Sequence, residues 1–534
     1  MVKSQVDPHS PPVIRSLVDA PHRQKLVLMG GLFIALFLVS LSQTVVATAA
    51  QNIVIDLGDF HLFPWLFAGF SLSAAVGVPV IGKMSDRYSR RKVILVSVGF
   101  FLITSAAACL AQTMSQLVIL RVLQGLGNAG VFASIWIIAA ALWRPEERAK
   151  WFGLLTAGFT LSGLAGPILG GAISDSLGWR WIFLLHLPVG SLAFLSLALS
   201  FPRIEDPRPE GGFDLAGATA FCCFSSSALC ALAFGTASLA WTHPAILILV
   251  GFAVVGLIAF LVIERSAEDP LIPLMLFRSR LFSGAMTASI TLTVSFMVIT
   301  VFIPLYVQGV KGLSATVAAF PLMSMAVGVA LGVNLAGPIL SRFNQPGALA
   351  SSGLAISSGV LFWLVTLGPG SPLITACVAT TVLGIGLSLA FMPLTVSVQN
   401  AMPNAVLGVV TSSLQFSRMF GMAAGGAILG ALLTSQITAG LGTELSGHAV
   451  ALADPEVLVS LDRLAEIRAL FAADPALGEG AYSAALTIAR ESLSNALGNM
   501  FAIAGLIAAA GIPVALVAFH RYSDQLHGLK QQEP

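Results

Sequence analysis

Two arginines stand inside apolar stretches of the chain, where a charged side chain is costly and usually functional. Arg121 lies in the stretch 117–143 and is followed three residues later by Gln124, whereas Arg418 lies in the stretch 408–433. Arg121 is either a functional charge or a structural hub that binds Gln124 and backbone carbonyls. Arg418 either contacts a bound molecule or ties its helix to a neighbour.

A basic stretch at 82–92 separates two long apolar stretches and contains a single acid, Asp86. Asp86 can pair with Arg90 or accept hydrogen bonds from the end of a neighbouring helix, which favours an acid near its N-terminus. Such a latch, formed by Gly82, Asp86, Arg87, Arg90 and Arg91, would hold two halves of the protein closed on the inside. Alternatively, the cations only fix the orientation of the chain in a membrane.

Titratable groups are scarce in the apolar stretches. Asp56 stands at the outer end of the first stretch, and His186 lies within 181–201, where it either titrates near neutral pH or is a satisfied buried histidine. No acid occurs between Asp269 and Glu444. Ser42 and Gln43 in the first stretch join Gln124 and Arg418 as candidates to line a central cavity.

The elements that must position these residues are membrane-spanning helices. The mean hydropathy is +0.90 and 10% of the residues are charged, whereas a soluble domain carries about 25%. Fourteen stretches approach the roughly 20 apolar residues that a span needs: 25–50, 63–83, 93–112, 117–143, 151–173, 181–201, 215–235, 245–263, 283–307, 315–340, 348–367, 373–396, 408–433 and 497–519. Lys and Arg concentrate in alternate loops, which predicts that both termini are cytoplasmic.

The same composition excludes other classes of protein. A net charge of +2 provides no basic face for nucleic acid. The five cysteines show no disulfide or metal spacing, and we expect neither a metal nor a cofactor. The sequence shows no spacing of a nucleophile and a base that would indicate an enzyme.

A short internal repeat divides the chain. Residues 82–88 align without gaps with residues 337–343, after the second and the tenth predicted spans. Two related six-helix halves with two inserted helices explain this spacing. The predicted domains are a cytoplasmic tail (1–24), a first bundle (25–201), a linker with two extra helices (202–264), a second bundle (265–521) and a cytoplasmic tail (522–534).

A polar segment at 435–496 lies within the second bundle and is expected on the outer side. Asp454-Pro455 predicts the start of an amphipathic helix. The segment is either a helical cap on the bundle or a surface for a partner. A membrane scaffold or receptor using this segment is therefore an alternative function.

Five motifs in order resemble the fourteen-helix drug–proton antiporters of the major facilitator superfamily, the EmrB/QacA type. They lie at 82–91, 121–127, 166–171, 179–190 and 270–278. The resemblance implies an all-α polytopic membrane protein with the major facilitator fold, two six-helix bundles plus two inserted helices. It also implies a role of Arg121 in proton movement. The helix-five motif of exporters corresponds here to Ser162, Gly166, Pro167, Gly170 and Gly171, small residues and a proline that suit a bent, closely packed helix.

Ser42 and His186 are among the positions that depart from the family pattern. Ser42 replaces the acid expected in the first span, and His186 stands where the family usually has Asn. The candidates for proton coupling are therefore Arg121, Asp56 and His186.

The sequence thus predicts an inner-membrane secondary transporter that exports small amphiphilic or apolar compounds by alternating access with proton coupling. Two cations and no central acid favour neutral or anionic substrates. A uniporter or importer of a metabolite or lipid-like molecule is the alternative within transport. Expected partners are the substrate and the lipid bilayer but not nucleic acid; protons and a periplasmic adaptor are candidates.

Overall fold

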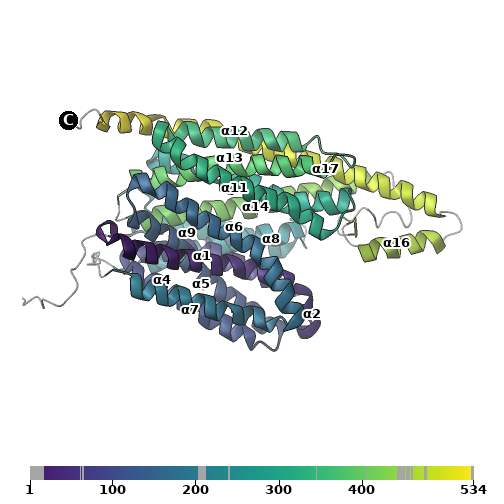
Figure 1. The fold of residues 1–534 in the computed structure, drawn as a ribbon, viewed down its shortest axis with the longest axis horizontal. Coiled ribbons are helices and arrows are strands. Elements are labelled where there is room, and N and C mark those ends of the chain that lie inside the picture. Colours follow the sequence, from purple (N-terminus) through teal and green to yellow (C-terminus); the bar gives the residue numbers. More distant parts are fainter. Residues whose placement is uncertain are drawn as a thin grey trace, which may run out of the picture. The chain divides into compact units, whose positions relative to one another are not determined.

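The computed structural model describes residues 17–59, 62, 65–202, 212–237, 241–343, 345–403, 406–441, 452, 457–458, 461–473 and 478–530. Within these ranges the chain forms helices and no strand (Figure 1). Thirteen of the helices described there are long and apolar enough to cross a membrane. The predicted fifth span is also a long helix, α6, of 32 residues.

The chain forms two compact units, and unit 1 comprises residues 1–213 and 402–412. After the short 3₁₀ helix η1 (Leu17–Asp19), its elements are α1 (His22–Thr48), α2 (Ala50–Leu57), α3 (Trp65–Arg87), α4 (Arg90–Cys109), α5 (Met114–Leu142), α6 (Pro145–Ser176) and α7 (Arg180–Ser200). Helix α1 packs on α6 and α7, α3 packs on α5, and α4 packs on α5 and α7.

Unit 2 comprises residues 214–401 and 413–534. Its elements are α8 (Leu215–Ala237), α9 (Pro244–Ser266), η3 (Leu274–Arg278), α10 (Arg280–Leu305), η4 (Tyr306–Val310), α11 (Ala315–Phe343), α12 (Pro346–Leu364), α13 (Leu373–Ala401), α14 (Leu407–Leu441, from residue 413), α16 (Leu461–Ala473) and α17 (Gly478–Lys530). Helix α11 packs on α13, α12 packs on α13 and α17, and α10 packs on α17.

The packing repeats between the units. The pairs α3–α5, α4–α5, α4–α7 and α1–α7 of unit 1 correspond to α11–α13, α12–α13, α12–α17 and α10–α17 of unit 2. Helix α14 lies against α10 at Gly421 and Gly425, and helix α6 lies against α1. The pair α10–α14 of unit 2 therefore corresponds to the pair α1–α6 of unit 1. The seven-residue sequence repeat falls at the ends of the corresponding helices α3 and α11. Helices α8 and α9 pack on each other and have no counterpart in unit 1.

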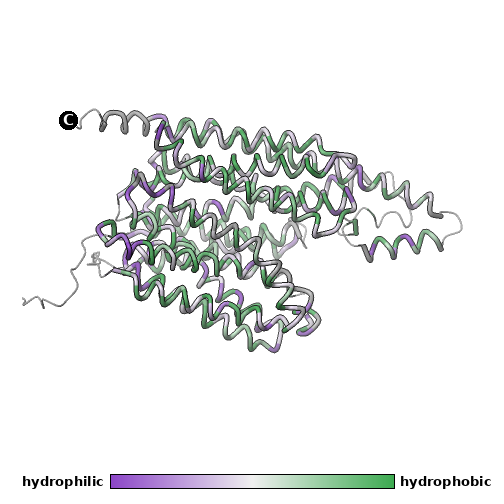
Figure 2. The backbone as a smooth tube through the Cα atoms, viewed as in Figure 1, coloured by the Kyte–Doolittle hydropathy of each residue, from purple (hydrophilic) through white to green (hydrophobic). Residues whose placement is uncertain are grey.

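The apolar composition of the helices explains why they form in a bilayer, where every backbone polar group must be satisfied within the helix. Figure 2 shows apolar residues along the helices and polar residues gathered at many of their ends. Helix α9 has the highest hydropathy of the candidate spans, and many of its large apolar side chains are exposed. A helix that is apolar on all sides and unburied by protein fits a lipid-facing position.

The helix ends differ from those predicted. Most of the basic stretch 82–92 is helical, because α3 continues to Arg87 and α4 begins at Arg90. Lys and Arg are good helix formers, so the apolar helices extend into their charged flanks. The last predicted span, 497–519, is the middle of α17, which has 53 residues and reaches into the predicted tail.

The polar segment 435–496 is largely helical where it is described. Helix α14 continues to Leu441, and α16 packs on the start of α17, with Phe471 edge-on to Tyr482. In Figure 1, α16 and the start of α17 extend beyond the other helices of unit 2. The predicted helix start at 454–455 lies outside the described residues.

Candidate functional site

A chain of hydrogen bonds connects four helices inside unit 1. Arg121 on α5 donates from Nη1 to Ser42 Oγ on α1 (3.1 Å) and to Gln124 Oε1 (2.7 Å). Gln124 Nε2 donates to Ser105 Oγ on α4 (2.5 Å), and this hydroxyl lies 3.4 Å from Nδ1 of His186 on α7. All five side chains are buried. The structure therefore brings four of the predicted site residues together, and Ser105, which was not predicted, connects them.

The backbone and an aromatic ring of α3 fix the guanidinium of Arg121. Its Nε donates to the carbonyl of Leu66 (3.1 Å), and its Cζ lies 4.0 Å from the ring centroid of Phe70. The aromatic face partly compensates the buried charge. Gln124 lies one turn further on the same face of α5, where it can receive one bond from Arg121 and donate the next.

This hydrogen-bonded cluster of side chains carries one permanent positive charge, that of Arg121, and contains no carboxylate. Protonating His186 would add a second positive charge close to the first, which low dielectric makes unfavourable. The rings of Phe101 and Phe183 lie edge-on to the imidazole. These surroundings favour a neutral, buried histidine over one that titrates.

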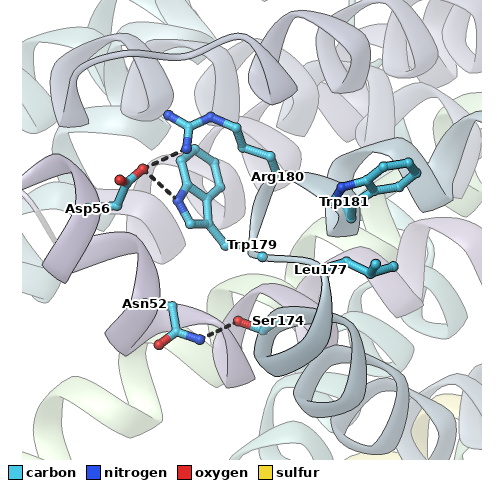
Figure 3. Close-up of a pocket in the computed structure, with 8 residues that line it drawn as sticks. Asn52, Asp56, Ser174, Leu177, Trp179, Arg180 and Trp181 are labelled. Atoms are coloured by element: carbon cyan, nitrogen blue, oxygen red, sulfur yellow. Dashed lines mark hydrogen bonds and ion pairs between the residues drawn. The ribbon is translucent and has the colours of Figure 1, made fainter.

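Asp56 lies elsewhere, in a pocket of about 580 Å³ formed by α2, the end of α6 and the start of α7 (Figure 3). Its carboxylate accepts hydrogen bonds from Arg180 Nη1 (2.6 Å) and from Trp179 Nε1 (3.0 Å). In the same pocket Asn52 donates to Ser174 Oγ (2.7 Å), which ties α2 to α6.

The hydrogen bond from Arg180, followed by that from Trp179, lowers the pKa of Asp56. The pair is half-exposed, at 48% for Asp56 and 40% for Arg180, so solvent screens the charges. Asp56 therefore stays ionised near neutral pH. This disfavours the proton-carrier role that its position in the sequence suggests.

Asp86 lies in the last turn of α3 and caps the N-terminus of α14. Its Oδ1 accepts a hydrogen bond from the backbone N–H of Gly408 (2.7 Å), and its Oδ2 accepts one from Val409 (2.8 Å). A Cβ atom at Gly82 would overlap Ser412, and one at Gly408 would overlap the Asp86 carboxylate. Both glycines therefore allow the close approach. The structure shows the expected hydrogen bonds from a helix end to Asp86, and the Arg90 cation also interacts with this carboxylate through its charge.

The cations around Asp86 are spread over both helices. Arg91 donates from Nη2 to the carbonyl of Ala198 at the end of α7 (2.8 Å). Arg87 and Arg90 are half-buried and also have interaction partners. The basic stretch thus binds neighbouring helix ends as well as marking a membrane face.

The predicted exporter motif lies on α6, which continues as a helix through all five positions: Ser162, Gly166, Pro167, Gly170 and Gly171. Thr44 of α1 donates to the carbonyl of Ser162 (3.4 Å). A Cβ atom at Gly166 would overlap the side chain of Thr44, whereas one at Gly171 would meet open space. The small residues on one side of α6 allow its contact with α1.

Arg418 forms a second buried polar cluster, in unit 2. Its Nη2 donates to Thr395 Oγ1 on α13 (2.6 Å), and its Nη1 donates to Gln415 Oε1 (3.2 Å). Its Cζ lies 3.8 Å from the ring centroid of Phe391. Gln43, in contrast, is exposed and lies outside both clusters.

Among the described residues, no group of three His, Cys, Asp or Glu side chains has the arrangement of a metal site. Two related helix bundles with buried polar clusters define a multi-pass membrane transporter. The family model of the Major Facilitator Superfamily matches residues 32–426. The chain belongs to the Major Facilitator Superfamily, and it is a transporter rather than an enzyme.

Curated relatives support this membership. Multidrug resistance protein 3 of Bacillus subtilis is 32% identical over 417 residues, covering 78% of this chain and 81% of the relative. The multidrug transporter protein MdtP of the same organism is 31% identical, covering 76% and 74%. The human organic anion transporter MFSD10 has a similar fold, with a TM-score of 0.59 at 13% identity, over 92% of this chain and 100% of that one.

Proposed function

We propose that this transporter exports small amphiphilic or apolar compounds across the inner membrane, as a fourteen-helix antiporter of the EmrB/QacA type with both termini in the cytoplasm. Two relatives with names that describe multidrug resistance or multidrug transport support the direction and the substrate class. The outer segment provides a surface for a periplasmic adaptor. Alternating access between the two units moves the substrate.

The hydrogen-bonded chain around Arg121 carries this proposal. It links α1, α4, α5 and α7 through buried polar side chains, so a change at Arg121 is transmitted to four helices of one bundle. Charged and polar residues buried within membrane helices mark substrate and ion pathways in transporters. Because the hydrogen-bonded cluster contains no carboxylate, the site favours neutral or anionic compounds over cations.

In the same proposal, Asp86 controls the switch between states. Its two hydrogen bonds stabilise the conformation in which α3 meets the start of α14. Releasing this contact allows α14 to move relative to α3. The small residues on α6 provide the sliding surface against α1.

A uniporter is the second candidate, and the residues of the hydrogen-bonded cluster around Arg121 favour it. Ser42 stands in place of a titratable acid and binds Arg121 directly. The hydrogen-bonded cluster therefore holds no carboxylate to carry a proton. A uniporter would equilibrate its substrate without accumulating it.

Flux in proteoliposomes tests both functions. The purified protein is reconstituted, and uptake of a neutral lipophilic dye is measured with and without an imposed pH gradient. A proton driven by about 150–200 mV releases roughly 3.5–4.5 kcal/mol, which supports accumulation on the order of a thousandfold. Gradient-driven accumulation supports antiport, equilibration alone supports the uniporter, and no flux contradicts both. Arg265→Ala, an exposed arginine outside the site, is the matched control for Arg121→Ala.

A further inference from the structure

Among the described residues, no acid forms an ion pair with the buried guanidinium of Arg418. The side chain is 4% exposed. Residues 270–443 contain no Asp or Glu, so helices α10 to α14 provide no acid. A buried charge without a partner costs several kcal/mol. The aromatic face of Phe391 offsets only part of this cost.

The hydrogen-bond donors around Arg418 are also incompletely used. Within the described part of the chain, Arg418 Nε and Gln415 Nε2 are buried and have no acceptor. The Gln415 oxygen already accepts from Arg418, so the amide group of this side chain remains a donor. Thr395 Oγ1 donates to the carbonyl of Phe391, so its hydroxyl proton is also engaged. Buried donors without acceptors require an explanation.

Arg121 and Gln124 show what a satisfied arginine–glutamine pair looks like. Arg121 also lies on an aromatic face and binds a glutamine three residues away. There, however, Nε donates to a carbonyl and the glutamine amide donates to Ser105. Neither Arg121 nor Gln124 has a buried nitrogen or oxygen left without a partner. The two arginine–glutamine pairs therefore differ in their unused donors, although His186 Nε2, at the far end of the Arg121 cluster, is also buried and without a partner in the described residues.

We infer that Arg418 and Gln415, supported by Thr395, form a binding subsite for a small anionic group. A positive charge with two free donors on adjacent side chains of α14 matches the acceptor oxygens of a carboxylate or sulfonate, or a halide ion. The anion is either an acidic group of the transported compound or a free inorganic anion. The inference rests on the proposed transport function only in the first case.

Thermal unfolding of the full-length protein in detergent tests the subsite without requiring transport. Chloride, benzoate and gluconate are compared at constant ionic strength, with gluconate as the reference because its polyhydroxylated chain is costly to bury among apolar helices. Chloride or benzoate is expected to raise the Tm relative to gluconate, and Arg418→Gln is expected to remove this rise. Gln415→Glu adds a carboxylate within reach of Arg418, so it should raise the Tm in gluconate and abolish the response to anions. Gln124→Glu, the matched change in unit 1, should leave the response in place.

Transport separates the two sources of the anion. Efflux of carboxyfluorescein and of ethidium is measured in proteoliposomes containing chloride or gluconate. If the acidic group of the substrate occupies the subsite, Arg418→Gln should reduce carboxyfluorescein flux relative to ethidium flux by about tenfold or more, the factor expected for one charge-assisted hydrogen bond. If a free anion occupies it, replacing chloride should reduce both fluxes equally in the unmodified protein.

The inference is wrong if no anion raises the Tm and Gln415→Glu does not stabilise the protein, because Arg418 would then be a structural link between α13 and α14. A protein that transports neither dye but shows the anion-dependent Tm would contradict the proposed function and leave the subsite supported.

Discussion

Replacing Asp86 by Asn removes a charged cap from the start of α14 while leaving the size of the side chain almost unchanged. The carboxylate accepts two hydrogen bonds, at 2.7 and 2.8 Å, and Asn keeps only one acceptor oxygen. A hydrogen bond to a charged group contributes about 1.5–3 kcal/mol, and the charge at the helix N-terminus adds about 0.3–1 kcal/mol. The capped conformation should therefore lose roughly 2–4 kcal/mol.

This loss should redistribute the conformations of the transporter. Because 1.4 kcal/mol corresponds to a factor of ten, the equilibrium should move by a factor of about 30 or more away from the capped conformation. Transport is expected to fall strongly, because the transporter cycles between states that must both be populated. Membrane insertion should be retained, since the cations that set orientation remain.

Hydrogen–deuterium exchange of peptides covering 402–412 reports the cap directly, and dye flux in proteoliposomes reports its consequence. In Asp86→Asn the amides of Gly408 and Val409 should exchange at least about tenfold faster. Glu268→Gln, at an exposed acid outside the site, is the control. Normal flux together with unchanged exchange at these amides would show that Asp86 neither caps α14 in the membrane nor controls the switch.

Three further changes test the remaining site residues. Arg121→Ala removes the donor shared by Ser42 and Gln124 and should abolish gradient-driven accumulation; accumulation at the level of Arg265→Ala would refute this role. His186→Asn should leave facilitated flux and any pH dependence between pH 6 and 8 unchanged, because the buried imidazole is neutral; a smaller pH dependence in the variant would show that His186 titrates and takes part in coupling. The lowered pKa of Asp56 means that its stabilising interaction is present above the unfolded value of about 3.9 and lost as pH falls through the folded value. Asp56→Asn should thus lower the Tm at pH 7, and this Tm difference should shrink as pH falls below the unfolded value; a Tm difference that stays constant into the acid range would contradict the assignment.

The fold was predictable because apolar stretches of about 20 residues require helices in a bilayer. Each predicted span contains or overlaps a long helix, and the short repeat at 82–88 and 337–343 correctly paired α3 with α11. The helix ends were not predictable to the same degree. Charged and polar flanks such as 478–496 are compatible with either a loop or a continued helix, and packing against α16 accompanies the helix there.

The candidate site was only partly predictable. The rarity of charges in apolar stretches pointed to Arg121 and Arg418, because a charged residue in such a stretch can be recognised without knowing its neighbours. Ser105, Gln415 and Thr395 were missed, since a serine, threonine or glutamine in a span is common and becomes significant only through its partner. A glutamine three residues from each arginine was the available signal, and it was recognised only at Arg121.

The two arginine clusters are alike for physical reasons rather than through the internal repeat. In the repeated packing, α5 corresponds to α13 and α6 to α14, so Arg121 and Arg418 lie on helices that are not counterparts. Each guanidinium nevertheless lies on a phenylalanine face and donates to a glutamine on its own helix. An apolar bundle offers few other means of holding a cation, since aromatic faces and neutral amides are the partners that cost least to bury. What distinguishes the clusters is the next bond outward: Gln124 finds Ser105, whereas Gln415 finds no acceptor in the described chain. This difference between the two arginine–glutamine pairs makes Gln124 a link among helices and leaves Gln415 and Arg418 able to bind a ligand.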